Sequence, residues 1–346
     1  MRRLRYSSLV FFAASAAAFG CSSSSDVPEY SAEIRRTSYG VAHVKADNYG
    51  SLGFGQGYAF AEDHACSLLD QVVKIRSERA KYLGPGENDR HVNSDFSYLH
   101  LGVYASAVAD FAEQPQRVQD LVTGYAAGVN AYVAEAGDAL EGYCAGEPWV
   151  GPITPTDLFA YYIDLALLAS GQNLISYIGA AVAPGTGDVA PTPPFTGLGF
   201  REAEIGSNGW GIGAGLSASG RGMVMGNPHF PWEGELRLWE SHLTIPGELD
   251  VYGAGLLGVP GVLIGFNEAV AWTHTVSAGH RFTAYKLELS PDDPTVYLVD
   301  GEARAMTSTE YAIEVLGDDG STSSLTRTLW RTHWGPMLSI AGSFDW

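Results

Sequence analysis

Basic residues are scarce in this chain of 346 residues, in which 20 Lys and Arg face 39 Asp and Glu for a formal net charge of −19. A phosphate backbone needs Lys and Arg, so this balance argues against a nucleic-acid partner. Charged residues make up only 17% of the chain and hydrophobic residues 46%, which excludes intrinsic disorder. The 42 glycines follow no three-residue period and heptads are absent, which excludes collagen-like and coiled-coil classes.

Several catalytic signatures are also missing. The sequence has no G-x-x-x-x-G-K-[ST], no H-E-x-x-H and no G-x-S-x-G, which argues against P-loop, zinc-helix and α/β-hydrolase enzymes. His274 and His280 lack the context of metal ligands, so we expect no metal and no cofactor. The glycine-rich runs at 53–57 and 209–215 are interpreted as turns and close-packed strands.

The N-terminus looks like a targeting segment. A basic start at 1–5 precedes an apolar run at 9–19 that is too short to span a bilayer, and Cys21 follows small residues. This pattern resembles a bacterial lipoprotein signal over 1–20, with Cys21 lipidated and 21–32 as a tether. The alternative is an ordinary secretory signal cut nearby. Both place the protein outside the cytoplasm, in the periplasm or on the outer membrane through a lipid anchor. The mature chain would carry 17 basic and 39 acidic residues, a net charge of −22.

Beyond Cys21 the chain has two cysteines, Cys66 and Cys144. In an oxidising compartment this pair predicts a disulfide bond. The alternative is two buried free thiols.

The rest of the chain divides by composition. Region 33–182 is mainly helical in pattern, 183–206 is a Pro/Gly/Thr-rich connector, and 207–346 contains short strands separated by turn residues. Apolar spacing predicts helices over 61–82 and 117–136. Helices followed by strands indicate an α+β fold.

A further helix start is marked by Thr154-Pro155-Thr156-Asp157. Thr154 is typical of an N-cap, Pro155 fits the first helical position, and Asp157 completes a capping box. We therefore expect a helix from this point to Gly171.

The most informative segment is Gly206-Ser-Asn-Gly-Trp210, followed by Gly226-Asn-Pro-His-Phe230. These runs resemble the penicillin-acylase family of N-terminal-nucleophile hydrolases, in particular the branch of acyl-homoserine-lactone and aculeacin-type acylases. The segments at 39–43, 55–63, 78–84, 271–277 and 281–283 are also similar to that branch. The resemblance implies an α+β, four-layer αββα fold with two stacked antiparallel sheets.

The resemblance also implies site residues. Cleavage of the Gly206–Ser207 bond would make Ser207 the nucleophile, and its freed α-amine, with a pKa of about 7.7–8.0, would serve as the base. His229 matches a family position that contacts the amine and the oxyanion, and Asn227 would brace the turn that presents His229. Phe230 matches a wall of the acyl pocket, and Val276 matches a backbone donor to the oxyanion.

The implied reaction is hydrolysis of the amide of an N-acylated amine, either an acyl-homoserine lactone or an acylated lipopeptide, by α- and β-chains of one precursor. Segment 277–284 holds no carboxylate, so we expect no calcium ion there. Family members run to about twice this length and take a second oxyanion donor from beyond Trp346, so an incomplete fold is expected. The alternatives are a catalytically inactive or truncated surface lipoprotein and a penicillin- or cephalosporin-type acylase.

Overall fold

The computed structural model describes residues 2–6, 29–168, 170–185, 191–192, 206–276, 279 and 281–340. Cys21, most of the predicted signal and tether, and most of the predicted connector lie outside the described residues. The helices are α1 (Tyr49–Ile75), α2 (Arg79–Leu83), α3 (Arg90–Leu101), α4 (Val103–Asp110), α5 (Gln116–Ala136), α6 (Pro155–Leu167) and α7 (Ile175–Gly179). Short 3₁₀ turns are η1 (Glu87–Asp89), η2 (Phe111–Glu113), η3 (Gly137–Ala139), η4 (Gly171–Leu174) and η5 (Ala214–Leu216).

A seven-stranded sheet has the order β1-β2-β3-β6-β7-β8-β9 and is antiparallel except between β3 and β6, which run parallel. Its strands are β1 (Arg2–Tyr6), β2 (Tyr30–Arg36), β3 (Ala42–Ala46), β6 (Leu238–Ile245), β7 (Leu249–Leu256), β8 (Ile264–Phe266) and β9 (Ala271–Trp272). The β3–β6 pair joins the start of the chain to its second half.

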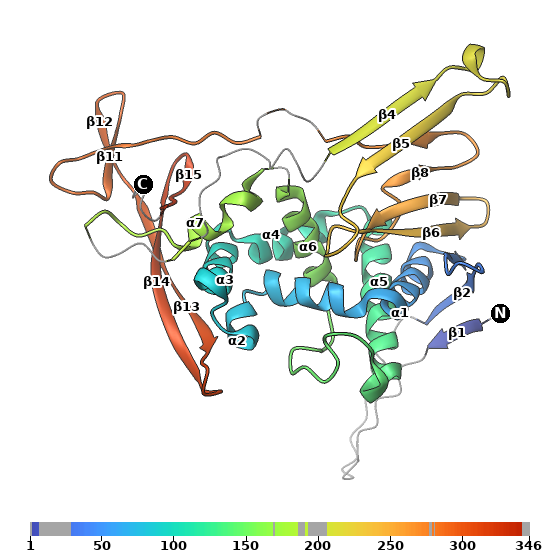
Figure 1. Cartoon of the computed structure of the whole chain (residues 1–346), viewed down its shortest axis with the longest axis horizontal. Coiled ribbons are helices and arrows are strands. Elements are labelled where there is room, and N and C mark those ends of the chain that lie inside the picture. Colours follow the sequence, from blue (N-terminus) through green and yellow to red (C-terminus); the bar gives the residue numbers. More distant parts are fainter. Residues whose placement is uncertain are drawn as a thin grey trace, which may run out of the picture.

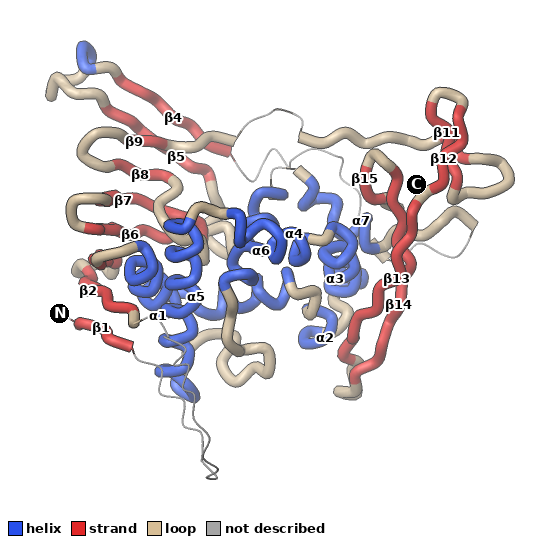
Figure 2. The backbone as a smooth tube through the Cα atoms, turned by 180° about the vertical axis from the view of Figure 1, so that it is seen from behind, coloured by secondary structure: helices blue, strands red, loops and turns tan. Residues whose placement is uncertain are grey.

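Smaller sheets hold the remaining strands. They are β4 (Gly206–Ile212) with β5 (Met223–His229), then β10 (Glu288–Leu289), β11 (Val296–Val299) and β12 (Glu302–Ala305), and finally β13 (Thr307–Leu316), β14 (Thr322–Thr332) and β15 (Gly335–Pro336). The helices lie between the seven-stranded sheet and the long β13–β14 hairpin, which packs on α2 and α3 (Figures 1 and 2). Mixed helices and sheets confirm the predicted α+β class.

One face of the seven-stranded sheet is covered by α1 and α5. Alternate residues of β3, Ala42, Val44 and Ala46, are buried in one core with Phe54 of α1 and Ala131 of α5. This period of two is what a strand with one covered face requires. The residues between them therefore lie on the opposite face of the sheet.

The helix predictions differ in outcome. The predicted helix over 117–136 is confirmed by α5, and Thr154 and Asp157 form the expected capping box at the start of α6, which ends at Leu167. The interpretation of 53–57 as turns and strand is wrong, because α1 begins at Tyr49 and contains these glycines. The reason is packing, since Cβ atoms at Gly53 and Gly57 would collide with the backbone of α5.

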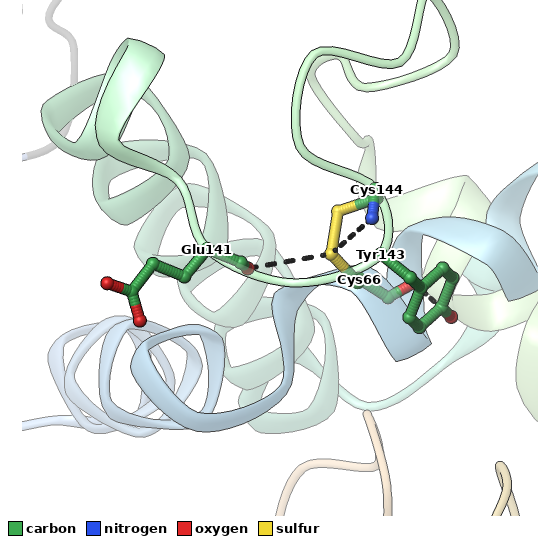
Figure 3. The surroundings of a disulfide bond; sticks show 4 residues. All are labelled: Cys66, Glu141, Tyr143 and Cys144. Carbon is green, nitrogen blue, oxygen red and sulfur yellow. Dashed lines mark hydrogen bonds between the residues drawn. A yellow bond between two sulfur atoms is a disulfide. The ribbon is translucent and has the colours of Figure 1, made fainter.

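A disulfide bond joins Cys66 of α1 to Cys144 in the loop after α5, with their Cα atoms 5.3 Å apart (Figure 3). The Tyr143 hydroxyl donates to the Cys66 carbonyl at 2.9 Å, and Cys144 is fully buried. A side chain at Gly142 would crowd the Cys66 sulfur, and its φ of +115° suits only glycine.

This bond closes a loop between residues 78 apart, so its loss frees much chain entropy in the unfolded state. We expect the double variant Cys66→Ser/Cys144→Ser to lose about 2–4 kcal/mol of unfolding free energy. Urea denaturation of both proteins with and without reductant measures this. Reductant should destabilise only the wild type; equal midpoints for wild type and variant would contradict the prediction.

No single helix in the described part of the chain is long and apolar enough to cross a membrane. One bent pair of helices, Pro155–Leu167 with Gly171–Gly179, is together long and apolar enough to cross a membrane, by length and composition only.

Candidate active site

The two segments singled out by sequence form one antiparallel ribbon. Strand β4 carries Gly206 and Ser207, and β5 ends with His229 (Figure 1). Their register pairs Gly206 with His229 and Ser207 with Pro228. Residues 21 and 23 positions apart in sequence are thus brought side by side by strand pairing.

Ser207 is half-buried, and its hydroxyl donates a hydrogen bond to the Gly206 carbonyl oxygen. That carbonyl belongs to the bond predicted to be cut. A serine hydroxyl becomes a useful nucleophile once a base accepts its proton. The arrangement therefore places a potential nucleophile against the potential scissile group.

The His229 imidazole lies beside Gly206. A Cβ atom built on Gly206 would lie 3.0 Å from His229 Nδ1, so glycine leaves the space that the ring occupies. Asn227 Nδ2 lies 3.2 Å from His229 Nε2. Because an amide nitrogen only donates, Nε2 accepts, and a neutral ring carries its proton on Nδ1, facing Gly206. Asn227 thus orients the ring from within β5, whereas the sequence predicted that it would brace a turn.

The opposite face of the ribbon meets the segment that follows β9. Ser207, Gly209 and Gly226 share this face, because residues alternate along each strand and Gly209 pairs with Gly226. Cβ atoms built on these two glycines would lie 2.9 Å from Thr273 Cγ2 and 2.6 Å from Thr273 Oγ1, respectively. Glycine at both positions allows the two layers to approach.

The residue before Val276 also packs against the ribbon. A Cβ atom built on Gly209 would also lie 3.5 Å from Thr275 Cγ2, and Val276 is the next residue and is half-buried. The segment before Val276 therefore packs on the ribbon face that bears Ser207. The role of the Val276 N–H as oxyanion donor stays a prediction, as does Phe230 as a pocket wall. Phe230 directly follows β5 and is half-buried.

Sequence reasoning missed Thr273 and the reason for the two glycines. The Thr273 hydroxyl is buried and has no hydrogen-bond partner in the described structure. Threonine is common in strands, so nothing in its local sequence separates this residue from ordinary strand residues. The clue would have been the matched glycines at 209 and 226, which leave room for an opposing side chain.

A cavity of about 650 Å³ lies elsewhere, between the ends of α3 and α6, η4–α7 and the chain around 281–287 and 332–338. Its described lining is mostly apolar and includes none of Ser207, His229, Phe230 and Val276. We therefore do not assign it to the acyl group.

The family model described as penicillin amidase matches residues 31–346. The chain belongs to the penicillin amidase family. This confirms the resemblance to this family drawn from the motifs.

Several relatives of this chain carry the name acylase. The acyl-homoserine lactone acylase PvdQ of Pseudomonas putida is 39% identical over 327 residues, covering 91% of this chain and 42% of its own length. The aculeacin-A acylase of Actinoplanes utahensis is 37% identical over 336 residues, covering 92% and 42%. A thermostable penicillin G acylase structure from Alcaligenes faecalis is 28% identical, covers 41% of this chain and 82% of its own, and has a TM-score of 0.35. The chain thus spans about two fifths of the length of PvdQ and of the aculeacin-A acylase.

Proposed function

We propose that this penicillin amidase family member hydrolyses the amide bond of N-acylated amines through an acyl-enzyme on Ser207. The observation that carries the proposal is the ribbon itself, with the Ser207 hydroxyl on the Gly206 carbonyl and His229 beside Gly206. Family membership and the acylases among its relatives support the hydrolase class.

The proposed activation is self-cleavage. Ser207 Oγ attacks the Gly206 carbonyl carbon and its proton passes to the Ser207 nitrogen. The Gly206–Ser207 C–N bond breaks, and the Gly206 acyl group moves to Oγ as an ester. Water then hydrolyses the ester, leaving a carboxylate on Gly206 and a free α-amine on Ser207. Glycine at 206 suits this step because it has no side chain to obstruct the attack.

In the proposed catalytic cycle the Ser207 α-amine accepts the hydroxyl proton as Oγ attacks the acyl carbon of the substrate. The proton passes to the leaving amine, and water releases the acyl group as a carboxylic acid. The Val276 N–H would stabilise the oxyanion, and His229, held by Asn227, would contact the amine.

Long-chain acyl-homoserine lactones or acylated lipopeptides are the proposed substrates, because relatives carry the names acyl-homoserine lactone acylase and aculeacin-A acylase. The test combines intact mass and N-terminal identification with release of acid from a substrate panel. We expect two chains, a new N-terminus at Ser207, and faster turnover of long-chain acyl lactones than of phenylacetyl amides. Faster phenylacetyl turnover would reverse the substrate assignment, and an uncut, inactive protein would overturn the mechanism.

We also propose an extracytoplasmic location with a lipid on Cys21, from the basic start, the apolar run and the small residues before this cysteine. Cells fed labelled palmitate should label the wild type and not Cys21→Ala. Labelling of the variant, or none of the wild type, would contradict the lipid anchor.

A further inference from the structure

The ribbon of β4 and β5 meets the large sheet at the end strand β9. The two ribbon strands form a sheet of their own, and β5 packs on β9, the last strand of the seven-stranded sheet. Figure 2 shows the ribbon beside β9 at this end of the large sheet. The side chains at this contact therefore determine where Ser207 lies relative to the rest of the molecule.

Thr273 lies at this contact, and the large sheet fixes its position. It directly follows β9, in which Trp272 pairs with Gly265 of β8. The Trp272 indole N–H also donates to the Leu263 carbonyl at 2.8 Å. Two interactions of the preceding residue thus hold Thr273 in place where it meets the ribbon.

Thr273 fills a notch in the ribbon that is formed by the paired glycines Gly209 and Gly226. A Cβ atom built on Gly209 would lie 2.9 Å from Thr273 Cγ2, and one built on Gly226 would lie 2.6 Å from Thr273 Oγ1. Each branch of the threonine side chain thus faces one glycine. At Gly211, the next residue of β4 on this face, a built Cβ meets no described atom within 4 Å, so the close contact ends at the notch.

The notch lies near both of the groups to which the proposed reaction assigns chemistry. Ser207 is the neighbouring residue of β4 on the same face, roughly 7 Å from Gly209 at the usual rise of a strand. Val276, whose N–H is the predicted oxyanion donor, is three residues after Thr273. One segment therefore supports the strand of the nucleophile and carries the donor. The fit of Thr273 in the notch consequently governs the separation of Ser207 from the Val276 N–H.

The shape of the Thr273 side chain, rather than its hydroxyl, accounts for this contact. Oγ1 is buried and has no hydrogen-bond partner among the described residues. A buried hydroxyl without a partner is destabilising, because it has lost its hydrogen bonds to water. Valine has the same branched shape with a methyl group in place of the hydroxyl, so it should fill the notch equally well.

We propose that Thr273 is a positioning residue for the nucleophile. Its branched side chain, seated between Gly209 and Gly226, holds Ser207 at the distance from the Val276 N–H that the reaction needs. This inference rests on the proposed function of Ser207. A misplacement of about 1 Å can cost about 100-fold in rate. Because Thr273 acts through the ribbon, its loss should lower kcat and leave KM nearly unchanged.

The test compares Thr273→Ala, which empties the notch, with Thr273→Val, which fills it. Acid release from an acyl lactone gives kcat and KM for the full chain. We expect kcat of Thr273→Ala to fall about 10–100-fold with KM within about threefold of wild type, and kcat of Thr273→Val to stay within about threefold. Self-cleavage at Gly206–Ser207 should slow in Thr273→Ala and not in Thr273→Val.

Hydrogen exchange measured by mass spectrometry tests the contact without any reaction, in chains that also carry Ser207→Ala. With Thr273→Ala the amide hydrogens of β4 and β5 should exchange faster and those of α5 at an unchanged rate, because only the ribbon loses its support. Val224→Ala is the matched control. Val224 lies opposite Gly211 on the same ribbon face and is 40% exposed, so its truncation should change neither kcat nor exchange.

A wild-type kcat in Thr273→Ala, or unchanged exchange of its ribbon, would overturn the proposal. Equal losses of kcat in Thr273→Val and Thr273→Ala would assign the role to the hydroxyl and overturn the argument from shape. Thr273→Ser, which lacks only the Cγ2 methyl, replaces Thr273→Ala if circular dichroism shows that the alanine variant does not fold. An uncut, inactive wild type would overturn the proposed function, whereas faster ribbon exchange in Thr273→Ala would still show that Thr273 holds the ribbon.

Discussion

Ser207→Ala is expected to stay a single uncut chain and to lose amide hydrolysis by about 10⁴–10⁶-fold, the range seen when a serine hydrolase loses its nucleophile. The variant lacks the hydroxyl that lies on the Gly206 carbonyl, so neither the ester at 206–207 nor an acyl-enzyme can form. Intact mass spectrometry shows whether the chain is cut, and acid release from an acyl lactone measures amide hydrolysis.

Ser219→Ala provides the matched control, because Ser219 is an exposed serine in the loop that joins β4 to β5. It should cleave and turn over like wild type. Ser207→Cys separates chemistry from folding, since a thiol is also a nucleophile and should retain some self-cleavage. Cutting of Ser207→Ala at the same bond, or activity within tenfold of wild type, would show that another residue is the nucleophile.

The residues proposed for this site could be singled out from the sequence because their signals are local. Ser207 and His229 stand in short runs with a family resemblance, and strand pairing only had to bring those runs together. The capping box of Thr154 and Asp157 is equally local, because it depends on residues three apart. Where function and structure depend on neighbours in sequence, the sequence carries the signal.

Contacts between distant segments could not be predicted in the same way. His43 and His242 are 199 residues apart, and only the parallel pairing of β3 with β6 makes them partners. Thr273 meets Gly209 and Gly226 through packing of a segment on a ribbon face. No local period marks either contact, because each is set by the fold.

The prediction for the start of α1 was wrong for a third reason. Glycine costs about 1 kcal/mol relative to alanine inside a helix, so Gly53, Gly55 and Gly57 argued for turns. In the structure these glycines lie in a helix that crosses its neighbours at close range. The packing that outweighs the helix propensity can itself be tested.

Gly124→Ala is expected to destabilise the fold by about 1–3 kcal/mol, although alanine favours helix formation by about 1 kcal/mol. Gly124 lies in α5, where an added Cβ would collide with the Gly50 carbonyl oxygen and lie 2.8 Å from its carbon. Backbone atoms cannot change rotamer to relieve the collision, so the two helices must separate. Separation would loosen the packing of Phe54 and Tyr125, both fully buried. Urea unfolding measures the loss.

The control adds the same methyl group where space is open. Gly151 has no atom within 4 Å of a built Cβ and no positive φ, so Gly151→Ala should change the unfolding free energy by less than about 0.5 kcal/mol. Helix propensity alone would raise the unfolding free energy of Gly124→Ala, whereas the backbone contact would lower it. The sign of the measured change therefore separates the two effects. Unchanged or increased stability would show that α1 and α5 are not held in backbone contact, and that packing does not explain the glycines of α1.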